Sequence, residues 1–274
     1  MRITFLGTGT SHGIPVIACS CPVCRSTDSH DKRYRSSIMV ESRGTVIVID
    51  TGYEFRLAAL RSGLSHLDAV LYTHSHSDHI MGLDDLRVFT HDGSLPLYGS
   101  GKTLEHISKV FDYAFTSHDW PHETADRKEE EAIIELRKHN YGLPLLKANI
   151  VAPFEEFRIG SLSIKAIPLM HGMMEIFGYR IGKLAYLTDV SSMSDESLEA
   201  IKGVDTLIIG ALRERRHPTH FTFSEAREIA VRCGCRRCYF THISHETSYE
   251  EINRRYAPLC QSSYDNLVLE VEDE

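Results

Sequence analysis

The densest group of residues able to do chemistry lies at Thr73–His79 and reads T-H-S-H-S-D-H. It holds three histidines and one aspartate, as H-x-H-x-D-H, directly after a short apolar run typical of a buried strand. Residues two apart on a strand share a face, so His74 and His76 point the same way. The following turn can bring Asp78 and His79 round to a second nearby point. Imidazole and carboxylate suit first-row divalent metals, so this pattern predicts two ions rather than a loop of solvated histidines.

Three further candidate ligands each stand just beyond an apolar stretch that is expected to form a strand. They are His171, Asp189 and His242. Functional residues favour such strand ends, because a rigid scaffold aims them. Asp50 also ends an apolar run and has two interpretations. It is either a hydrogen-bond partner of a metal-bound histidine or a carboxylate of the turn.

A cysteine motif, C-x-C-x-x-C, is formed by Cys19, Cys21 and Cys24. Three thiolates this close can wrap one Zn²⁺, which takes four tetrahedral ligands in structural sites, so a fourth must come from elsewhere. The same spacing recurs at Cys233–Cys238. We expect these later thiols to lie in the core, because the first is on the apolar face of a helix and the last alternates in phase with Phe240.

The H-x-H-x-D-H motif resembles the signature of the metallo-β-lactamase superfamily, and the later candidates follow in the matching order over nearly the whole chain. The resemblance implies two divalent ions, Zn or Mn, in the active site. It assigns one ion to His74, His76 and His171, the other to Asp78, His79 and His242, with Asp189 bridging. Two such ions with two carboxylates and a hydroxide carry about one positive charge, which attracts a phosphate group.

One histidine near the C-terminus matches the phosphodiesterase branch of this superfamily. There, a histidine 22 residues before the last metal ligand binds phosphate or protonates the leaving oxygen, and His220 stands 22 residues before His242. We therefore count His220 as a catalytic residue. Asp78 of the metal motif is the second catalytic candidate. His217, Arg213 and His220 are candidate substrate contacts, although Arg213 could also belong to a solvated charged surface.

A closer resemblance is to the phosphoribosyl 1,2-cyclic phosphate phosphodiesterases. In that branch, a C-x-C-x-x-C loop and a histidine three residues past the last catalytic ligand hold a structural zinc. Carried over to this chain, those ligands are Cys19, Cys21, Cys24 and His245.

The expected fold class is α/β (α+β), an αββα sandwich. Strands and helices are predicted to alternate in two similar halves, which suits two packed sheets with helices on both outer faces, and the superfamily resemblance implies the same architecture. We expect one domain over residues 1–274, with an insertion around residues 112–146 that covers or flanks the site.

Composition narrows the partners and the compartment. The chain has 274 residues, 42% of them hydrophobic, a formal charge of −8 and 16 histidines. An acidic chain argues against non-specific binding to nucleic acid, whose phosphates attract basic surfaces. No apolar run reaches the ~18 residues of a membrane span, and no signal peptide is recognisable. We expect a cytoplasmic protein, because the seven cysteines would stay reduced in that compartment. We expect no membrane partner, and the sequence is compatible with a homodimer.

These patterns favour a dinuclear metal-dependent phosphodiesterase that hydrolyses a small cyclic or nucleotide-like diester with a metal-bound hydroxide. One alternative is a tRNA 3′-processing nuclease, which the acidic composition and the lack of a basic arm disfavour. Another is a thioester or lactone hydrolase, for which the cysteine loop and His220 are not expected. A non-catalytic metal-binding or nucleotide-sensing module is the third, and an activity assay with metal titration separates it.

Overall fold

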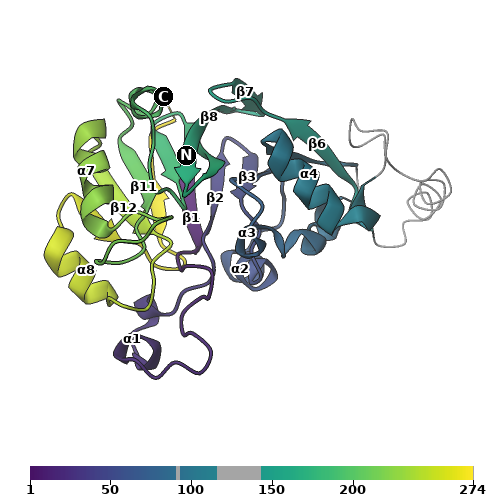
Figure 1. Ribbon diagram of the computed structural model, residues 1–274. Coiled ribbons are helices and arrows are strands. Elements are labelled where there is room, and N and C mark those ends of the chain that lie inside the picture. The colour runs from purple at the N-terminus through teal and green to yellow at the C-terminus, as the bar shows by residue number, and fades with distance from the viewer. Residues whose placement is uncertain (91–92, 116–142, 274) are drawn as a thin grey trace.

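The computed structural model describes residues 1–90, 93–115 and 143–273. Within them, two seven-stranded sheets pack face to face and helices cover both outer surfaces, so the expected αββα sandwich is confirmed (Figure 1). Most of the predicted insertion at residues 112–146 lies outside the described residues. Its ends form a short 3₁₀ helix, η3 (Asp112–Ala114), and the start of a strand at Leu146.

The first sheet comes from the N-terminal half of the chain and one C-terminal strand. Its order is β14 (Val268–Glu270), β1 (Arg2–Gly7), β2 (Ser37–Ser42), β3 (Thr45–Ile49), β4 (Ala69–Leu71), β5 (Leu95–Gly99) and β6 (Leu146–Ile150). The pairs from β14 to β3 are antiparallel, and those from β3 to β6 are parallel.

The second sheet comes from the C-terminal half. Its order is β13 (Cys260–Ser262), β12 (Arg237–Thr241), β11 (Thr206–Gly210), β10 (Leu184–Leu187), β9 (Met174–Ile181), β8 (Leu162–His171) and β7 (Glu156–Ile159). Strands β10 to β13 are parallel, and β7 to β10 are antiparallel.

Helices flank the sheets on both sides. They are α1 (Pro22–Arg25), α2 (Phe55–Ser62), α3 (Ser77–Ile80), α4 (Gly101–Val110), α6 (Asp195–Ala200), α7 (Phe223–Cys233) and α8 (Tyr249–Tyr256), with the 3₁₀ helices η1 (Ser29–Asp31) and η2 (Leu83–Phe89). A capping box begins α7: the Thr222 hydroxyl accepts from the Glu225 N–H, and the Glu225 carboxylate accepts from the Thr222 N–H.

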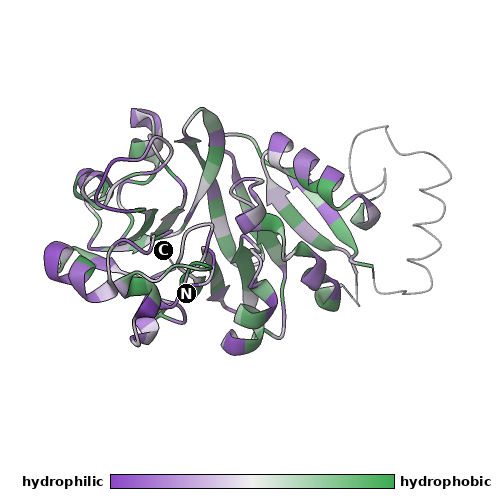
Figure 2. Cartoon of the chain, turned by 60° about the horizontal axis from the view of Figure 1, so that its bottom comes forward, coloured by the Kyte–Doolittle hydropathy of each residue, from purple (hydrophilic) through white to green (hydrophobic). Residues whose placement is uncertain are grey.

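The core consists of three apolar layers, as a sandwich requires. The central layer lies between the two sheets and includes Ile38 and Ile47 of the first and Tyr179 and Ile208 of the second. One outer layer packs α2, α4 and η2 on the first sheet, and the other packs α6, α7 and α8 on the second. Figure 2 shows the same division, with hydrophobic residues gathered along the strands and polar ones on the outward sides of the helices.

Two short strands lie near the C-terminus. Strand β13, from Cys260 to Ser262, was not predicted, since three residues are too short to show a strand periodicity. It pairs with β12, where Cys260 lies opposite Cys238. The last strand, β14, is equally short and spans Val268–Glu270. Neither strand carries a candidate functional residue.

Close backbone contact holds the segment after β3 against α3. The Thr51 N–H donates to the His79 carbonyl at 2.7 Å, and the Thr51 carbonyl accepts from the Gly82 N–H at 2.8 Å. Gly52 lies so near that a Cβ on it would collide with the carbonyl oxygen of Asp78. A side chain at this position therefore disturbs the turn that carries two candidate metal ligands.

We predict that Gly52→Ala destabilises the fold by about 1–3 kcal/mol, because the added methyl group forces backbone apart. Gly101→Ala is the matched control, since a Cβ at Gly101 would meet only Ile150, at 3.7 Å. Urea unfolding of both variants measures the difference. Equal stability of the two would show that the contact at Gly52 is not a tight one.

Candidate functional site

The candidate metal ligands meet at one edge of the sandwich, beyond the carboxyl ends of several strands. The loop after β4 and helix α3 supply the ligands of the H-x-H-x-D-H motif. Strand β8 ends in His171, Asp189 follows β10, and His242 follows β12. All seven predicted side chains are in contact with at least one other, although they come from both halves of the chain.

Asp50 organises the first-sheet side of this cluster. Its carboxylate accepts hydrogen bonds from the Thr73 N–H at 2.9 Å, the Thr73 hydroxyl at 2.8 Å and His79 Nδ1 at 2.8 Å. A carboxylate accepts and does not donate when ionised, so the proton of His79 is on Nδ1 and its Nε2 is left with a lone pair. Of the two interpretations of Asp50, the hydrogen-bond partner of a ligand histidine is the one that the structure supports.

Thr73, which is hydrogen-bonded to Asp50, orients the ring of His74. Its hydroxyl proton goes to Asp50, so the oxygen can only accept from His74 Nδ1, 3.0 Å away. That contact directs the Nε2 lone pair of His74 toward the cluster, where it lies 3.0 Å from His76 Nδ1. Thr73 had no role in the sequence prediction, although its hydroxyl directly precedes the metal motif.

His171 is oriented from the second sheet. Its Nδ1 lies 2.8 Å from the carbonyl oxygen of Asp189 and 2.7 Å from that of Thr219. Carbonyl oxygens only accept, so Nδ1 carries the proton and Nε2 holds the lone pair. The hydrogen bonds of His171, His79 and His74 thus leave the same nitrogen available on each ring.

Asp189 stands at the centre of the cluster, and its two carboxylate oxygens face different partners. Oδ2 lies 3.2 Å from His79 Nε2, while Oδ1 lies 3.0 Å from His242 Nε2 and 3.7 Å from His220 Nδ1. Asp78 adds a second carboxylate, with Oδ2 3.3 Å from His79 Nε2 and 3.7 Å from His242 Nε2.

Several of these buried nitrogens have no hydrogen-bond partner. His79 Nε2 and both ring nitrogens of His242 are among the buried side-chain atoms left without one in the described part of the chain. Buried polar atoms are normally satisfied, so each such atom requires an explanation. Metal ions fit these atoms, because neutral imidazole nitrogens and carboxylate oxygens are the donors that Zn²⁺ and similar ions take.

The geometry reproduces one of the two predicted ligand sets as a compact group. Asp78, His79 and His242 form one set with all donor atoms within 4.8 Å of one another, as the second metal requires. His74, His76 and His171 do not form such a set in the described residues, although the His76 and His171 rings lie 5.1 Å apart. Two other sets share Asp189: one with His74 and His79, the other with His171 and His220.

The charges of the cluster also favour a cation. Burial alone would lower the pKa of His79, but Asp78 and Asp189 raise it well above its usual value. The pKa of His242 is likewise lowered by burial but raised overall to about 9, chiefly by Asp189. The carboxylates therefore attract positive charge to this point, and a divalent ion would supply it in place of these protons.

Three of the polar residues at this edge have a backbone that L-residues seldom adopt. The φ angles of Asp50, Asp189 and His242 are 64°, 54° and 56°, in the left-handed region. Each such residue costs on the order of 1–3 kcal/mol and persists only where the surroundings hold it. All three stand just after a strand, where a sharp turn of the chain directs the side chain into the cluster.

His220 lies over the cluster from the segment before α7. Its ring stacks on that of His242 with centroids 4.8 Å apart, and it meets the His171 ring edge-on at 4.7 Å. Burial and the neighbouring His242 lower its pKa to about 3. A neutral ring of this kind can donate one hydrogen bond to a phosphate, and proton donation to a leaving group requires that a bound anion first raise that pKa.

The other two predicted substrate contacts differ from each other. The His217 ring lies 5.1 Å from that of His220, at the same edge. Arg213 hydrogen-bonds to Glu246 at 2.9 Å, and Arg215 binds the same carboxylate. The charge of Arg213 is therefore already neutralised, which makes it a weaker candidate for substrate binding than the sequence suggested.

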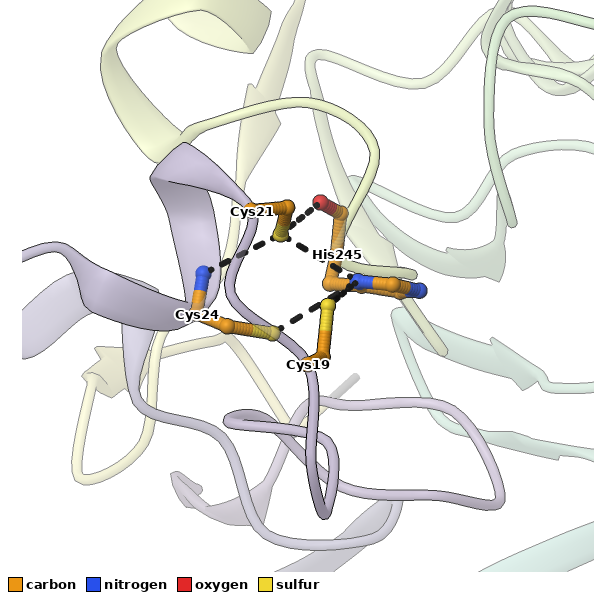
Figure 3. A group of neighbouring side chains, drawn as sticks. All are labelled: Cys19, Cys21, Cys24 and His245. Carbon is orange, nitrogen blue, oxygen red and sulfur yellow. Dashed lines mark hydrogen bonds between the residues drawn. The ribbon is translucent and has the colours of Figure 1, made fainter.

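The cysteine loop and His245 form a second cluster, separate from the candidate catalytic ligands. His245 Nδ1 lies 3.3 Å from the sulfurs of Cys19 and Cys21 and 3.5 Å from that of Cys24 (Figure 3). All four donor atoms lie within 4.8 Å of one another. Burial raises the pKa of Cys21, but the Cys24 N–H and His245 lower it overall to about 6, so its thiolate is favoured at neutral pH. Three thiols and one imidazole are a suitable donor set for structural zinc.

The later cysteine motif does not form such a cluster. Among the described residues, Cys233, Cys235 and Cys238 are absent from the groups compact enough to hold an ion. All three are buried in the apolar layer under α7. They are therefore core thiols in the structure.

None of the helices in the described ranges is long and apolar enough to span a bilayer.

Sequence comparisons agree with this fold and site. A family model for the beta-lactamase superfamily domain matches residues 45–243. An octanoyltransferase from Porphyromonas gingivalis is 35% identical over all of this chain, which spans only 52% of that protein. A ribonuclease Z from Methanopyrus kandleri is 25% identical and covers 87% of this chain and 92% of its own length.

Solved structures include two informative matches. The crystal structure of a diphosphatase from the PhnP family is 39% identical, covers 99% of this chain and 98% of its own, and superposes with a TM-score of 0.86. The Zn²⁺-bound PqqB from Methylobacterium extorquens shares the fold, with a TM-score of 0.74 at 20% identity over 99% of this chain and 100% of its own. The family model covers well over half of the chain and the diphosphatase structure matches almost all of it, so the chain belongs to the metallo-β-lactamase superfamily, in its PhnP branch, as a metal-dependent hydrolase.

Proposed function

We propose that the protein hydrolyses a small phosphodiester, cyclic or nucleotide-like, with two divalent ions, Zn or Mn, at the histidine and aspartate cluster. The observation that carries the proposal is the set of buried ring nitrogens that face the Asp189 carboxylate but form no hydrogen bond. The similar structure that bears the name of a diphosphatase supports a phosphate-containing substrate over a thioester or lactone.

The metal assignment follows the superfamily pattern. One ion would be held by His74, His76 and His171, the other by Asp78, His79 and His242, and Asp189 would bridge them. The split of the Asp189 oxygens between His79 on one side and His242 on the other supports the bridging role. Paired ions of this kind lower the pKa of bound water and neutralise charge on the attacking and leaving oxygens.

The residues around the metals would position the substrate. His220 lies over His171 and His242, so it can reach a phosphate bound at the ions and donate to a phosphate oxygen or to the leaving oxygen. His217 lies behind it and is the second candidate contact. Asp78 counts as catalytic because its carboxylate faces His79 and His242 and would set the charge of their ion.

The second cluster would hold a structural Zn²⁺ at Cys19, Cys21, Cys24 and His245. Such an ion would fasten the N-terminal loop to the segment that follows His242. Two backbone hydrogen bonds already join these regions, from Thr10 to Ile243 and from Ile243 to Thr8. Zinc at this point would therefore support the geometry of the catalytic cluster. Seven free thiols are compatible with our proposal of a cytoplasmic location.

A nuclease acting on tRNA 3′ ends is the second candidate, because of the similarity to ribonuclease Z over most of both chains. The formal charge of −8 weakens it, since phosphate backbones bind basic surfaces. Octanoyl transfer is weaker still, because that name belongs to a protein of about twice this length. A substrate panel with a pre-tRNA, small diesters and a thioester separates these functions.

We expect His76→Ala and Asp189→Ala to lose catalytic metal and turnover while the fold remains. Both would be ligands, so their removal opens the metal coordination. Metal analysis of the purified variants, with circular dichroism for the fold, measures this. His66→Ala is the control, an exposed histidine paired only with Asp68. A ligand variant with full metal content and activity would contradict the assignment.

Cys21→Ser should remove one zinc and lower the melting temperature, by about 5 °C or more, because structural zinc contributes to folding directly. The variant should lose thermal stability while its kcat changes little. Cys235→Ser serves as the matched control from the later motif. Zinc lost from Cys235→Ser and retained in Cys21→Ser would refute the site.

His220→Ala should keep both catalytic metals and lose about 10²–10⁴ in rate on a ribose cyclic phosphate, if the ring assists the leaving oxygen. The loss should be smaller on bis(p-nitrophenyl) phosphate, whose leaving group needs no proton. An equal loss on both substrates indicates phosphate binding instead. Loss of a metal ion would make His220 a ligand, as its set with His171 and Asp189 also permits.

A further inference from the structure

A cavity beside the metal cluster is lined in part by the candidate substrate contacts His217 and His220. It has a volume of about 580 Å³, and we call it the side cavity. The turn at Gly172 and the pair Ser191–Ser192 line one wall, and the segment Arg216–His220 lines the other, with Glu225. His220 lines this cavity and its ring also contacts those of His171 and His242, so the side cavity adjoins the metal cluster at His220.

Arg216 is the cation of this cavity, and its guanidinium has no close partner. Its side chain is 89% exposed, and its ion pair with Glu225 is long, 3.9 Å from Nε to Oε1. The other oxygen of Glu225 accepts from the backbone N–H and the hydroxyl of Thr222. Glu225 is thus held by the helix cap, and the forked N–H donors at the edge of the Arg216 guanidinium are left to bind another anion.

The neighbouring arginine is in a different state. Arg215, like Arg213, binds Glu246 through charge-assisted hydrogen bonds of 2.9 Å. It does not line the side cavity. Of the three arginines in this segment, Arg216 alone combines a position on the cavity wall with a guanidinium that no close carboxylate engages.

The part of the cavity lined by Gly172, Ser191 and Ser192 is polar but carries no charged side chain. The Ser191 hydroxyl accepts from the Gly172 N–H and donates to the Met170 carbonyl, both at 2.9 Å. These bonds hold the turn after β8 in shape. Ser192 is exposed. The charge that the cavity can recognise therefore comes from the side of Arg216.

We infer that the side cavity receives the leaving group of the phosphodiester, and that Arg216 is a specificity-determining residue for leaving groups that carry a further anion, a phosphate or a carboxylate. This inference rests on the proposed phosphodiesterase function. It follows from the place of the cavity on the His220 side and from the unengaged guanidinium. A bidentate contact from arginine to either anion is strong enough to alter substrate preference.

The test compares the charge of the two ester groups separately. Methyl 4-nitrophenyl phosphate and methyl 3-carboxy-4-nitrophenyl phosphate differ only in a carboxylate on the leaving group. Thymidine 5′-(4-nitrophenyl phosphate), with and without a 3′-phosphate, differs only in the retained group. The ratio of kcat/KM within each pair is measured for wild type, Arg216→Ala, Arg216→Lys and the control Arg215→Ala.

We expect Arg216→Ala to lower the preference for the carboxylated leaving group about tenfold, as loss of a hydrogen bond to a charged group predicts. Arg216→Lys should restore part of it, and Arg215→Ala should leave it unchanged. A preference unaffected by Arg216→Ala, or lost equally in Arg215→Ala, overturns the inference. So does a change confined to the 3′-phosphate pair. If none of the diesters is hydrolysed, the proposed function itself fails, which is a distinct outcome.

Discussion

The buried carboxylate of Asp50 is the constraint on which the site depends. It is fully buried, and burial of a charge is costly unless hydrogen bonds and opposite charge compensate for it. Burial raises its pKa, while His79 and the donors of Thr73 counteract that rise. The same bonds determine which nitrogen of His79 is protonated and, through the Thr73 hydroxyl, which nitrogen of His74. Asp50 thus orients the rings of two candidate metal ligands.

The sandwich provides what a single loop cannot, namely two independent walls for one cluster. The first sheet presents the motif residues, and the second presents His171, Asp189 and His242. Direct bonds join the walls: the Phe177 N–H donates to the Thr73 carbonyl at 2.9 Å. The left-handed backbone at Asp189 and His242 is tolerated because both walls hold it. A rigid cluster of this kind suits chemistry in which the protein orients ions and substrate rather than supplying a nucleophile of its own.

The charge around the site is distributed unevenly, and this distribution favours a small substrate over a long nucleic acid. The chain as a whole is acidic, and most basic side chains near the cluster are already paired, as Arg213 and Arg215 are with Glu246. A long nucleic acid would need an extended basic surface. A small substrate with one further anion needs only one available cation, and Arg216 is placed to supply it. The local arrangement, rather than the net charge, is what agrees with a small phosphodiester.

Local spacing was enough to predict much of this protein from sequence. The H-x-H-x-D-H motif and the three-cysteine loop with His245 match known patterns, and the strand ends at His171 and His242 follow from periodicity. Contacts between distant segments were not predictable. The choice between two roles for Asp50, the tautomer of His171 and the contrast between Arg213 and Arg216 each depend on partners that the fold brings together. Periodicity and spacing describe neighbours along the chain, whereas protonation and free charge depend on neighbours in space.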